Sequence, residues 1–364
     1  MRSRTLCLLA TGTWVSGAVF AAAYAQNSPA VPNAAIPTQI PGIGIVPPPP
    51  AGFNTLVATP VERSRYAVPP MPDPHVAPGA YRAWERAVAA PQKRDASPML
   101  EQIPLYNGPN QKAGEDVPQG LSSAAATSNN WSGYVYVDSN NPFKTEAVLG
   151  VFTVPTAHQA FGSCTGGWDY SSLWIGVDGW NSNDVFQAGV EVDAYCSSGT
   201  TTPYYSAWIE WYPYSETRVS SPVINPGDLL AVEVWNTSPT AGYAYFYDYS
   251  SEASAEYTLT APSGTTLVGN SVEWIVERPG VGGGLATLTN YIDSAWSNGV
   301  AWNYTASSPT YYVIGSPPPT GTLEQVTMVD NNGLGISSTV VEAGDFLWFQ
   351  DFGSACGRTG APPC

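Results

Sequence analysis

The sequence predicts an all-β protein, a two-sheet antiparallel β-sandwich or jelly roll, preceded by a mostly irregular prosegment. From residue 129 onward, short runs alternate apolar and polar residues with a period of two. Gly, Pro, Asn and Asp separate these runs, and no window shows sustained helical periodicity. About a dozen such strands in roughly 240 residues are typical of a sandwich or jelly roll.

The predicted strands follow one another at short intervals along this region. They cover residues 131–138, 146–154, 171–177, 184–195, 205–212, 229–235, 243–249, 256–261, 271–277, 286–292, 323–329 and 346–350. Turn sequences separate them, as in Asn225-Pro226-Gly227-Asp228, Asn298-Gly299 and Asn331-Asn332-Gly333.

The first 25 residues predict a secretory signal peptide. Arg2 and Arg4 give a positive start, an apolar stretch follows, and Ala23-Tyr24-Ala25 has the form of a cleavage site. We therefore expect a secreted protein, either extracellular or periplasmic. No later segment approaches about 18 consecutive apolar residues, so we expect no membrane partner.

Residues 26–125 predict a proline-rich propeptide, and residues 126–364 the catalytic β-sandwich domain. A helical patch is expected from Pro78 to Ala90, where Tyr81, Trp84 and Val88 would share one face. The alternative for this stretch is a disordered linker. The maturation site is expected between about residues 110 and 128, where the proline-rich pattern gives way to the alternating pattern of strands.

The predicted propeptide and the β-sandwich domain differ in net charge. From residue 126 onward the chain has 4 basic and 22 acidic residues, a formal charge of 4 − 22 = −18, whereas residues 26–125 carry 7 of each. Such an acidic domain argues against a nucleic-acid partner. It favours adaptation to acid over solubility alone, and it makes the chain's own propeptide, which concentrates arginines such as Arg63, Arg82 and Arg86, an expected partner.

Export permits disulfides. Cys7 leaves with the signal peptide, and the four remaining cysteines allow three pairings. We favour Cys164–Cys196 and Cys356–Cys364, because each closes a local loop in an oxidising compartment. A metal site is disfavoured, because CxxC spacing and histidine ligands are lacking.

Elimination leaves carboxylates as the catalytic groups. His75 and His158 are the two histidines of the chain, and His158 follows a proline in a loop of small residues, which argues against a Ser-His-Asp triad or a zinc enzyme. No unpaired cysteine is expected in the mature chain to act as a nucleophile. The Asp-Thr/Ser-Gly signature of aspartic peptidases is approached only by Asp178-Gly179.

Five motifs in order carry a resemblance. They are Asn130-Trp131-Ser132-Gly133, Leu173-Trp174-Ile175-Gly176-Val177-Asp178-Gly179, Phe186-Gln187-Ala188-Gly189, Ala207-Trp208-Ile209-Glu210-Trp211-Tyr212-Pro213 and Val272-Glu273-Trp274-Ile275-Val276-Glu277. In this order and spacing the chain resembles the glutamic peptidases, or eqolisins, over roughly residues 128 to 350. The resemblance implies a concanavalin-like sandwich of two antiparallel sheets, which agrees with the strand pattern.

The resemblance also implies site residues. The family's catalytic glutamate and glutamine match Glu273 and Gln187, and neither a metal nor another cofactor is implied. Its substrate-site positions resemble Trp131, Gly133, Trp174, Asp178 and Tyr212. One departure is Ser206, which stands where fungal members commonly carry an acid.

The chemistry suits the pair. A reference glutamate has a pKa of about 4.3, so Glu273 can accept a proton from water in mild acid, while the Gln187 amide can stabilise an oxyanion at any pH. Strand alternation points both side chains away from the more apolar side, toward an exposed or concave face. Gly189, on the face of Gln187, is expected to leave room for a substrate backbone.

The leading hypothesis is a monomeric acid endopeptidase that acts on extended polypeptides. One alternative is a non-catalytic carbohydrate-binding sandwich, suggested by the stripe of Tyr243, Tyr245, Tyr247 and Tyr249. Such a stripe also packs commonly against its neighbours. Another alternative is a glycosidase with paired carboxylates, which would need an acid where Gln187 stands.

Overall fold

The computed structural model describes residues 35–89, 94–111, 125–138, 146–160, 164, 166–316, 320–343 and 346–351. The predicted signal peptide, the predicted Cys356–Cys364 pair and most of the interval expected to hold the maturation site lie outside these residues.

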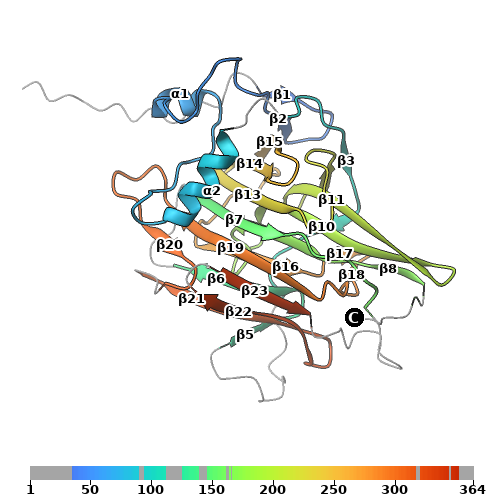
Figure 1. Cartoon of the computed structure of the whole chain (residues 1–364). Coiled ribbons are helices and arrows are strands. Elements are labelled where there is room, and N and C mark those ends of the chain that lie inside the picture. Colours follow the sequence, from blue (N-terminus) through green and yellow to red (C-terminus); the bar gives the residue numbers. More distant parts are fainter. Residues whose placement is uncertain are drawn as a thin grey trace, which may run out of the picture.

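The described residues form a two-layer antiparallel β-sandwich, which confirms the predicted fold class (Figure 1). The first layer runs, in order of pairing, through β3 (Leu100–Gln102), β12 (Thr217–Val219), β11 (Thr200–Trp211), β10 (Phe186–Ser197), β9 (Ser172–Val177), β16 (Ser271–Glu277), β6 (Trp131–Val137) and β21 (Thr322–Val329). The second runs through β1 (Ile36–Pro37), β2 (Ile43–Ile45), β15 (Ala253–Thr260), β14 (Ala241–Asp248), β13 (Leu229–Ser238), β7 (Ala147–Thr153) and β19 (Asp293–Trp302).

The two layers belong to one hydrogen-bonded sheet that bends back on itself. The bend passes through β22 (Gly335–Ala343), which pairs with β21, and β23 (Phe346–Asp351), which pairs with β19. Short strands flank the layers: β8 (Gly167–Asp169) beside β10, β5 (Ala125–Ser128) beside β21, and β20 (Tyr311–Val313) beside β19. A separate small sheet holds β4 (Leu105–Tyr106), β17 (Gly280–Val281) and β18 (Gly284–Leu285).

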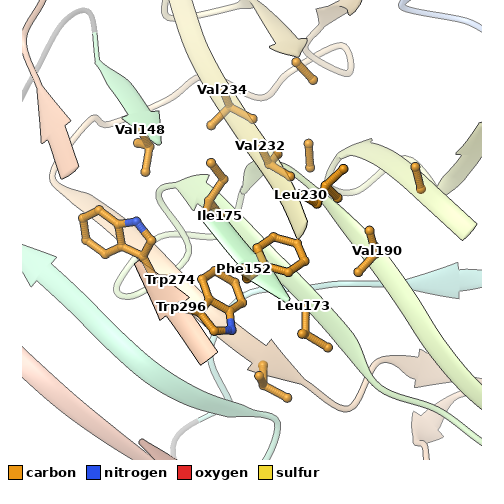
Figure 2. Close-up of a cluster of buried hydrophobic side chains, with 14 of the residues drawn as sticks. Val148, Phe152, Leu173, Ile175, Val190, Leu230, Val232, Val234, Trp274 and Trp296 are labelled. Carbon is orange, nitrogen blue, oxygen red and sulfur yellow. The ribbon is translucent and has the colours of Figure 1, made fainter. Parts of the chain in front are cut away.

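The hydrophobic core lies between the layers. Figure 2 shows Phe152 of β7 and Val232 of β13 gathered with Ile175 of β9 and Trp274 of β16. All four side chains are at most 1 % exposed. The indole N–H of Trp274 also donates to the carbonyl of Leu149 across the layers at 3.0 Å, so this buried side chain keeps its polar atom satisfied.

Every predicted strand but one overlaps an observed strand. The prediction for residues 286–292 is wrong, because this stretch makes only isolated bridges and Ile292 has a φ of 61°, which breaks an extended run. Asn298-Gly299 was also wrongly predicted as a turn between strands. It forms a bulge inside β19, where the register shifts between Ser297 and Val300 and Asn298 takes a φ of 57°.

The predicted prosegment is more regular than expected. Between residues 35 and 111 it contributes β1 to β4, α1 (Pro60–Arg65) and α2 (Pro78–Val88). Helix α2 confirms the expected helical patch: Pro78 opens it, and Trp84 and Val88 are 1 % and 4 % exposed. Neither described helix is both long and apolar enough to cross a bilayer.

Helix α2 covers the outer face of the second layer, where the tyrosine stripe lies (Figure 1). The hydroxyls of Tyr245 and Tyr249 donate to the carbonyls of Ala87 and Ala83 at 2.8 and 2.7 Å. The stripe therefore packs against the chain's own helix.

Charge attraction accompanies this packing. Arg94, just beyond α2, forms an ion pair of 2.8 Å with Glu256 of β15, and both side chains are almost fully buried. The guanidinium of Arg86 lies 4.6 Å from the ring centroid of Tyr249. Basic residues of the predicted propeptide thus contact the acidic domain.

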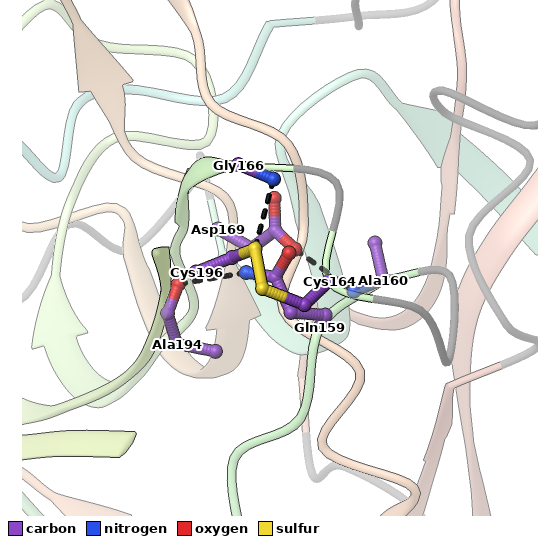
Figure 3. Close-up of a disulfide and its surroundings, with 7 residues drawn as sticks. All are labelled: Gln159, Ala160, Cys164, Gly166, Asp169, Ala194 and Cys196. Carbon is purple, nitrogen blue, oxygen red and sulfur yellow. Dashed lines mark hydrogen bonds between the residues drawn. A yellow bond between two sulfur atoms is a disulfide. The ribbon is translucent and has the colours of Figure 1, made fainter. Parts of the chain in front are cut away.

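The favoured pairing Cys164–Cys196 is confirmed (Figure 3). The disulfide ties the end of β10 to the loop before β8. Around it, the backbone N–H of Ala160 donates to Asp169 at 2.8 Å, and burial raises the pKa of this carboxyl to about 6.

Phe152→Ala tests the core. Phe152 is fully buried and stacks on Trp296 with ring centroids 4.4 Å apart, so its loss should lower the free energy of unfolding by about 3–5 kcal/mol. Urea titration measures this change. Val340→Ala, at a side chain that is 39 % exposed, is the control and should change stability by less than about 0.5 kcal/mol. Equal effects of both substitutions would contradict the assigned core.

Candidate active site

Gln187 and Glu273 lie in one row that crosses the first layer. The antiparallel register pairs Gln187 of β10 with Gly176 of β9, and Glu273 of β16 with the same Gly176. Directly paired residues point to the same face of a sheet, so both side chains project from one face. Neighbouring strands are about 4.8 Å apart, which separates the two backbones by about 10 Å. The row continues with Glu210 beyond Gln187 and Val135 beyond Glu273.

Gly176 lies between the pair, and its lack of a side chain lets Trp174 and Gln187 pack closely there. A Cβ at this position would lie 3.1 Å from the Cβ of Gln187 and 3.0 Å from the ring of Trp174. A side chain here would stand between the amide and the carboxyl. Sequence reasoning gave Gly176 no role, although it stands inside a quoted motif, because its place in the row depends on the register of three strands.

Both side chains point away from the core, as predicted from alternation. The two side chains are themselves buried, since Gln187 and Glu273 are 0 % exposed. Residues 107–111, which belong to the predicted propeptide, supply hydrogen bonds and packing over this part of the face.

Nearly every backbone polar group of this covering segment (residues 107–111) is matched by the domain. The N–H of Asn107 donates to Glu210 at 3.0 Å, and its carbonyl accepts from the Nε2 amide of Gln187. Further along, the Gly108 carbonyl accepts from Trp131 Nε1 at 3.1 Å, and the Pro109 carbonyl accepts from Asn130 Nδ2 at 3.2 Å. The N–H of Asn110 donates to the Gly179 carbonyl at 3.0 Å, and the N–H of Gln111 donates to Asn130 Oδ1 at 2.8 Å. This is how a site for an extended peptide binds its ligand.

Glu210 orients the amide of Gln187. The Nε2 group of Gln187 donates to Glu210 Oε2 at 2.9 Å as well as to the Asn107 carbonyl, so both of its protons have acceptors. Glu210 belongs to one of the five motifs, but no role was predicted for it from the sequence. The signal was available, because continuing the β10–β11 hairpin places Glu210 directly opposite Gln187.

Burial dominates the electrostatics of Glu273. It raises the pKa of this carboxyl well above the ordinary value, against the lowering effect of the nearby Ser271 hydroxyl. Within 3.5 Å, neither carboxyl oxygen has a hydrogen-bond partner among the described residues. In this covered state burial favours the protonated form of Glu273.

A second row of acids lies parallel to the first. Glu191 of β10 and Glu277 of β16 are both register partners of Ser172 of β9. Glu277 accepts from Asn130 Nδ2 and Trp174 Nε1, each at 2.9 Å. Burial, as the largest cause, raises the pKa of both glutamates.

The departure at Ser206 falls beside this second row. Ser206 pairs with Glu191, so an acid at position 206 would face a carboxyl that is already buried. Glu216 and Asp193 lie beside Glu191, and burial followed by the charge of Glu191 raises the pKa of each.

The predicted substrate-binding residues fall into two groups. Trp131 and Tyr212 contact the covering segment: Trp131 through its indole, and Tyr212 through a ring carbon that would lie 3.3 Å from a Cβ on Gly108. Trp174 lies beneath, donating to Glu277.

The other two predicted positions have structural contacts. Asp178 has a φ of 70° and accepts backbone N–H groups from residues 268–270 at 2.6–3.1 Å. Gly133 has a φ of 149°, and a Cβ there would collide with the carbonyl of Trp274.

The prediction for Gly189 is wrong. A Cβ at this position would lie 2.2 Å from the Leu173 carbonyl oxygen and 2.6 Å from the Cβ of Trp174, so the space beside the glycine is filled by β9. The glycine permits Trp174 to pack closely.

Other catalytic arrangements find little support among the described residues. His158 forms a backbone bridge with Asn290 in a loop. No group of three or more His, Cys, Asp or Glu side chains in the described part of the chain is placed to hold a metal ion.

The sandwich thus holds an amide and buried carboxyls beneath an extended peptide segment. The sequence profile of the Peptidase A4 family matches residues 129–337, and the chain belongs to this family of glutamic peptidases, or eqolisins. It is accordingly a peptide hydrolase. A search of curated protein sequences found no match.

Solved structures of glutamic peptidases are among the matches to the fold. Scytalido-glutamic peptidase, solved with a transition state analog inhibitor, is 20% identical, covers 61% of this chain and 98% of its own, and has a TM-score of 0.45. Aspergilloglutamic peptidase from Aspergillus niger is 26% identical, covers 50% of this chain and 99% of its own, and has a TM-score of 0.41.

The raised pKa values predict that stability falls as pH rises. The folded chain keeps protons that the unfolded chain releases, so stability is fully present below the ordinary glutamate pKa of about 4.3 and is lost progressively above it. Urea midpoints should therefore fall between about pH 4 and pH 7.

Glu191→Gln should reduce this decline, because it removes one buried titrating group whose pKa is raised. Glu101→Gln, at an exposed side chain, is the control and should leave the decline unchanged. A midpoint that rises with pH in the unsubstituted chain would show that the buried acids do not govern stability.

Proposed function

We propose that the chain is a secreted acid endopeptidase in which Glu273 is the general base and acid and Gln187 is the oxyanion donor. The observation that carries this proposal is the covering segment, because the carbonyl of an extended peptide accepts a hydrogen bond from the Gln187 amide, in a row that also holds Glu273. A substrate in the same position would present its scissile carbonyl to both groups.

The first step is attack by water. Ionised Glu273 takes a proton from a water molecule, whose oxygen bonds to the carbonyl carbon. The carbonyl π electrons move to its oxygen, and the Gln187 N–H stabilises the resulting oxyanion. Glu210 supports this step because it holds the amide in place.

The second step breaks the peptide bond. The oxyanion re-forms the carbonyl, the C–N bond breaks, and Glu273 returns its proton to the leaving nitrogen. The products are a carboxylic acid and an amine. These two steps need neither a metal nor a covalent intermediate.

The covering segment must leave before Glu273 can act. Burial beneath it favours the protonated form of the carboxyl, and access of water would bring its pKa back toward the ordinary range. We propose that residues 26–125 are a propeptide and that its residues 107–111 block the site.

Acid alone is not expected to release the propeptide through its buried ion pair. Burial raises the pKa of Glu256 to about 8 despite the opposing effect of Arg94. The docked state therefore binds a proton more readily than the free state, and lower pH favours docking at this group. Cleavage of the chain is the more effective trigger.

Substitution of the pair tests the mechanism with denatured casein at about pH 3 to 4. Glu273→Gln should lower kcat about 10²–10⁴-fold because the base is lost. Gln187→Ala should lower it about 10²–10³-fold because the oxyanion donor is lost.

The matched control is Glu324→Gln, a partly buried strand carboxylate paired with Val135 at the end of the row, which should retain activity. Undiminished cleavage by Glu273→Gln would overturn the mechanism.

A further inference from the structure

Asn107 occupies the centre of the covering segment. Its carbonyl accepts from Gln187 Nε2 and its N–H donates to Glu210, so it takes the position in which the residue before the cleaved bond would lie if Gln187 is the oxyanion donor. This placement of Asn107 rests on the proposed function.

The side chain of Asn107 enters a closed polar pocket. Asn107 is 0 % exposed, and its Nδ2 group donates to Glu216 Oε2 at 3.1 Å. Glu216, also 0 % exposed, lies between β11 and β12. The backbone of Glu216 is held on both sides, because its N–H donates to the Leu105 carbonyl and its carbonyl accepts from Ile103, each at 3.0 Å.

The pocket would penalise an apolar side chain. Glu216 lies beside Glu191 and Asp193, with Arg218 as the nearby cation. Within 3.5 Å, neither Glu216 Oε1 nor Asn107 Oδ1 has a hydrogen-bond partner among the described residues, while Asn107 Nδ2 supplies a donor to the other Glu216 oxygen. Without a donor in the pocket, a buried carboxyl would lose that bond as well, and unsatisfied buried polar groups are costly.

We propose that this pocket receives the side chain of the residue that precedes the cleaved bond, and that Glu216 selects an amide side chain there, asparagine before others. Asparagine fits this pocket, because Asn107 of the covering segment already occupies it. Leucine has nearly the same shape but no donor, so it is the informative competitor.

The direct test uses the active wild-type enzyme and two peptides that differ only in Asn or Leu before a single cleavable bond. The ratio of kcat/KM values should favour Asn by about tenfold or more, since a pocket built to hydrogen-bond a group rejects the analogue that lacks it. Equal values, or a preference for Leu, would overturn the proposal. If casein is still cleaved in that case, the proposed function stands; absence of all peptidase activity would remove both.

Variants at Glu216 assign the preference to that residue. In Glu216→Met the Asn-to-Leu ratio should fall at least about tenfold, because the acceptor is gone. In Glu216→Gln the amide oxygen can still accept, so the ratio should remain in favour of Asn. An unchanged ratio in Glu216→Met would show that Glu216 does not recognise the side chain. Glu252→Met, at an exposed side chain of the β-sandwich domain, controls for the substitution itself.

A second test uses the full-length chain and changes only residue 107, so that Glu216 and the rest of the pocket stay as they are. Asn107→Leu should loosen the covering segment, because Glu216 loses its donor. Hydrogen exchange at the N–H of residue 107 should then be faster than in Asn107→Gln, whose longer side chain keeps a donor. Equal protection in the two variants would contradict recognition through the amide.

Discussion

The register of three strands governs this site. Gln187 and Glu273 are far apart in sequence, but both are paired with Gly176, which lies on the strand between them. Two strand spacings, about 10 Å, leave room for a peptide carbonyl and a water molecule between the side chains. Because Gly176 has no side chain, no Cβ stands between the two members of the pair. A shift of one residue in either pairing would send one member of the pair into the core.

Burial of acids is the second constraint, and it connects the fold with acid conditions. Glu191, Glu210, Glu216, Glu273 and Glu277 are all at most 1 % exposed, and burial raises the pKa of each. Several charged carboxylates at such short range would repel one another in a medium of low dielectric constant. Protonation removes this repulsion, so a cluster that is costly at neutral pH is tolerated in acid.

The region before the sandwich covers two faces in different ways. Helix α2 seals the outer face of the second layer by packing on the tyrosine stripe. Residues 107–111 cover the opposite side of the molecule mainly through backbone hydrogen bonds. The first contact is of the kind that stabilises a fold, whereas the second occupies groups that a substrate would otherwise use.

Much of this arrangement could be predicted from local sequence. Alternation gave the strands and the shared face of Gln187 and Glu273, because side-chain direction depends only on period two. Alternation could not give the register between distant strands, so Gly189 was assigned an open space that β9 fills. Asn298-Gly299 has the composition of a turn, yet its neighbours continue one strand through a bulge. The contact of Asn107 with Gln187 had no local signal, because it joins positions separated by 80 residues.

A crystal structure of the active enzyme with a peptide that carries a non-hydrolysable tetrahedral group in place of one amide tests the central claim most directly. We predict one oxygen of this group within about 3 Å of Gln187 Nε2 and the other within about 3 Å of a Glu273 carboxyl oxygen. A tetrahedral group bound elsewhere, or contacted by only one member of the pair, would contradict the account.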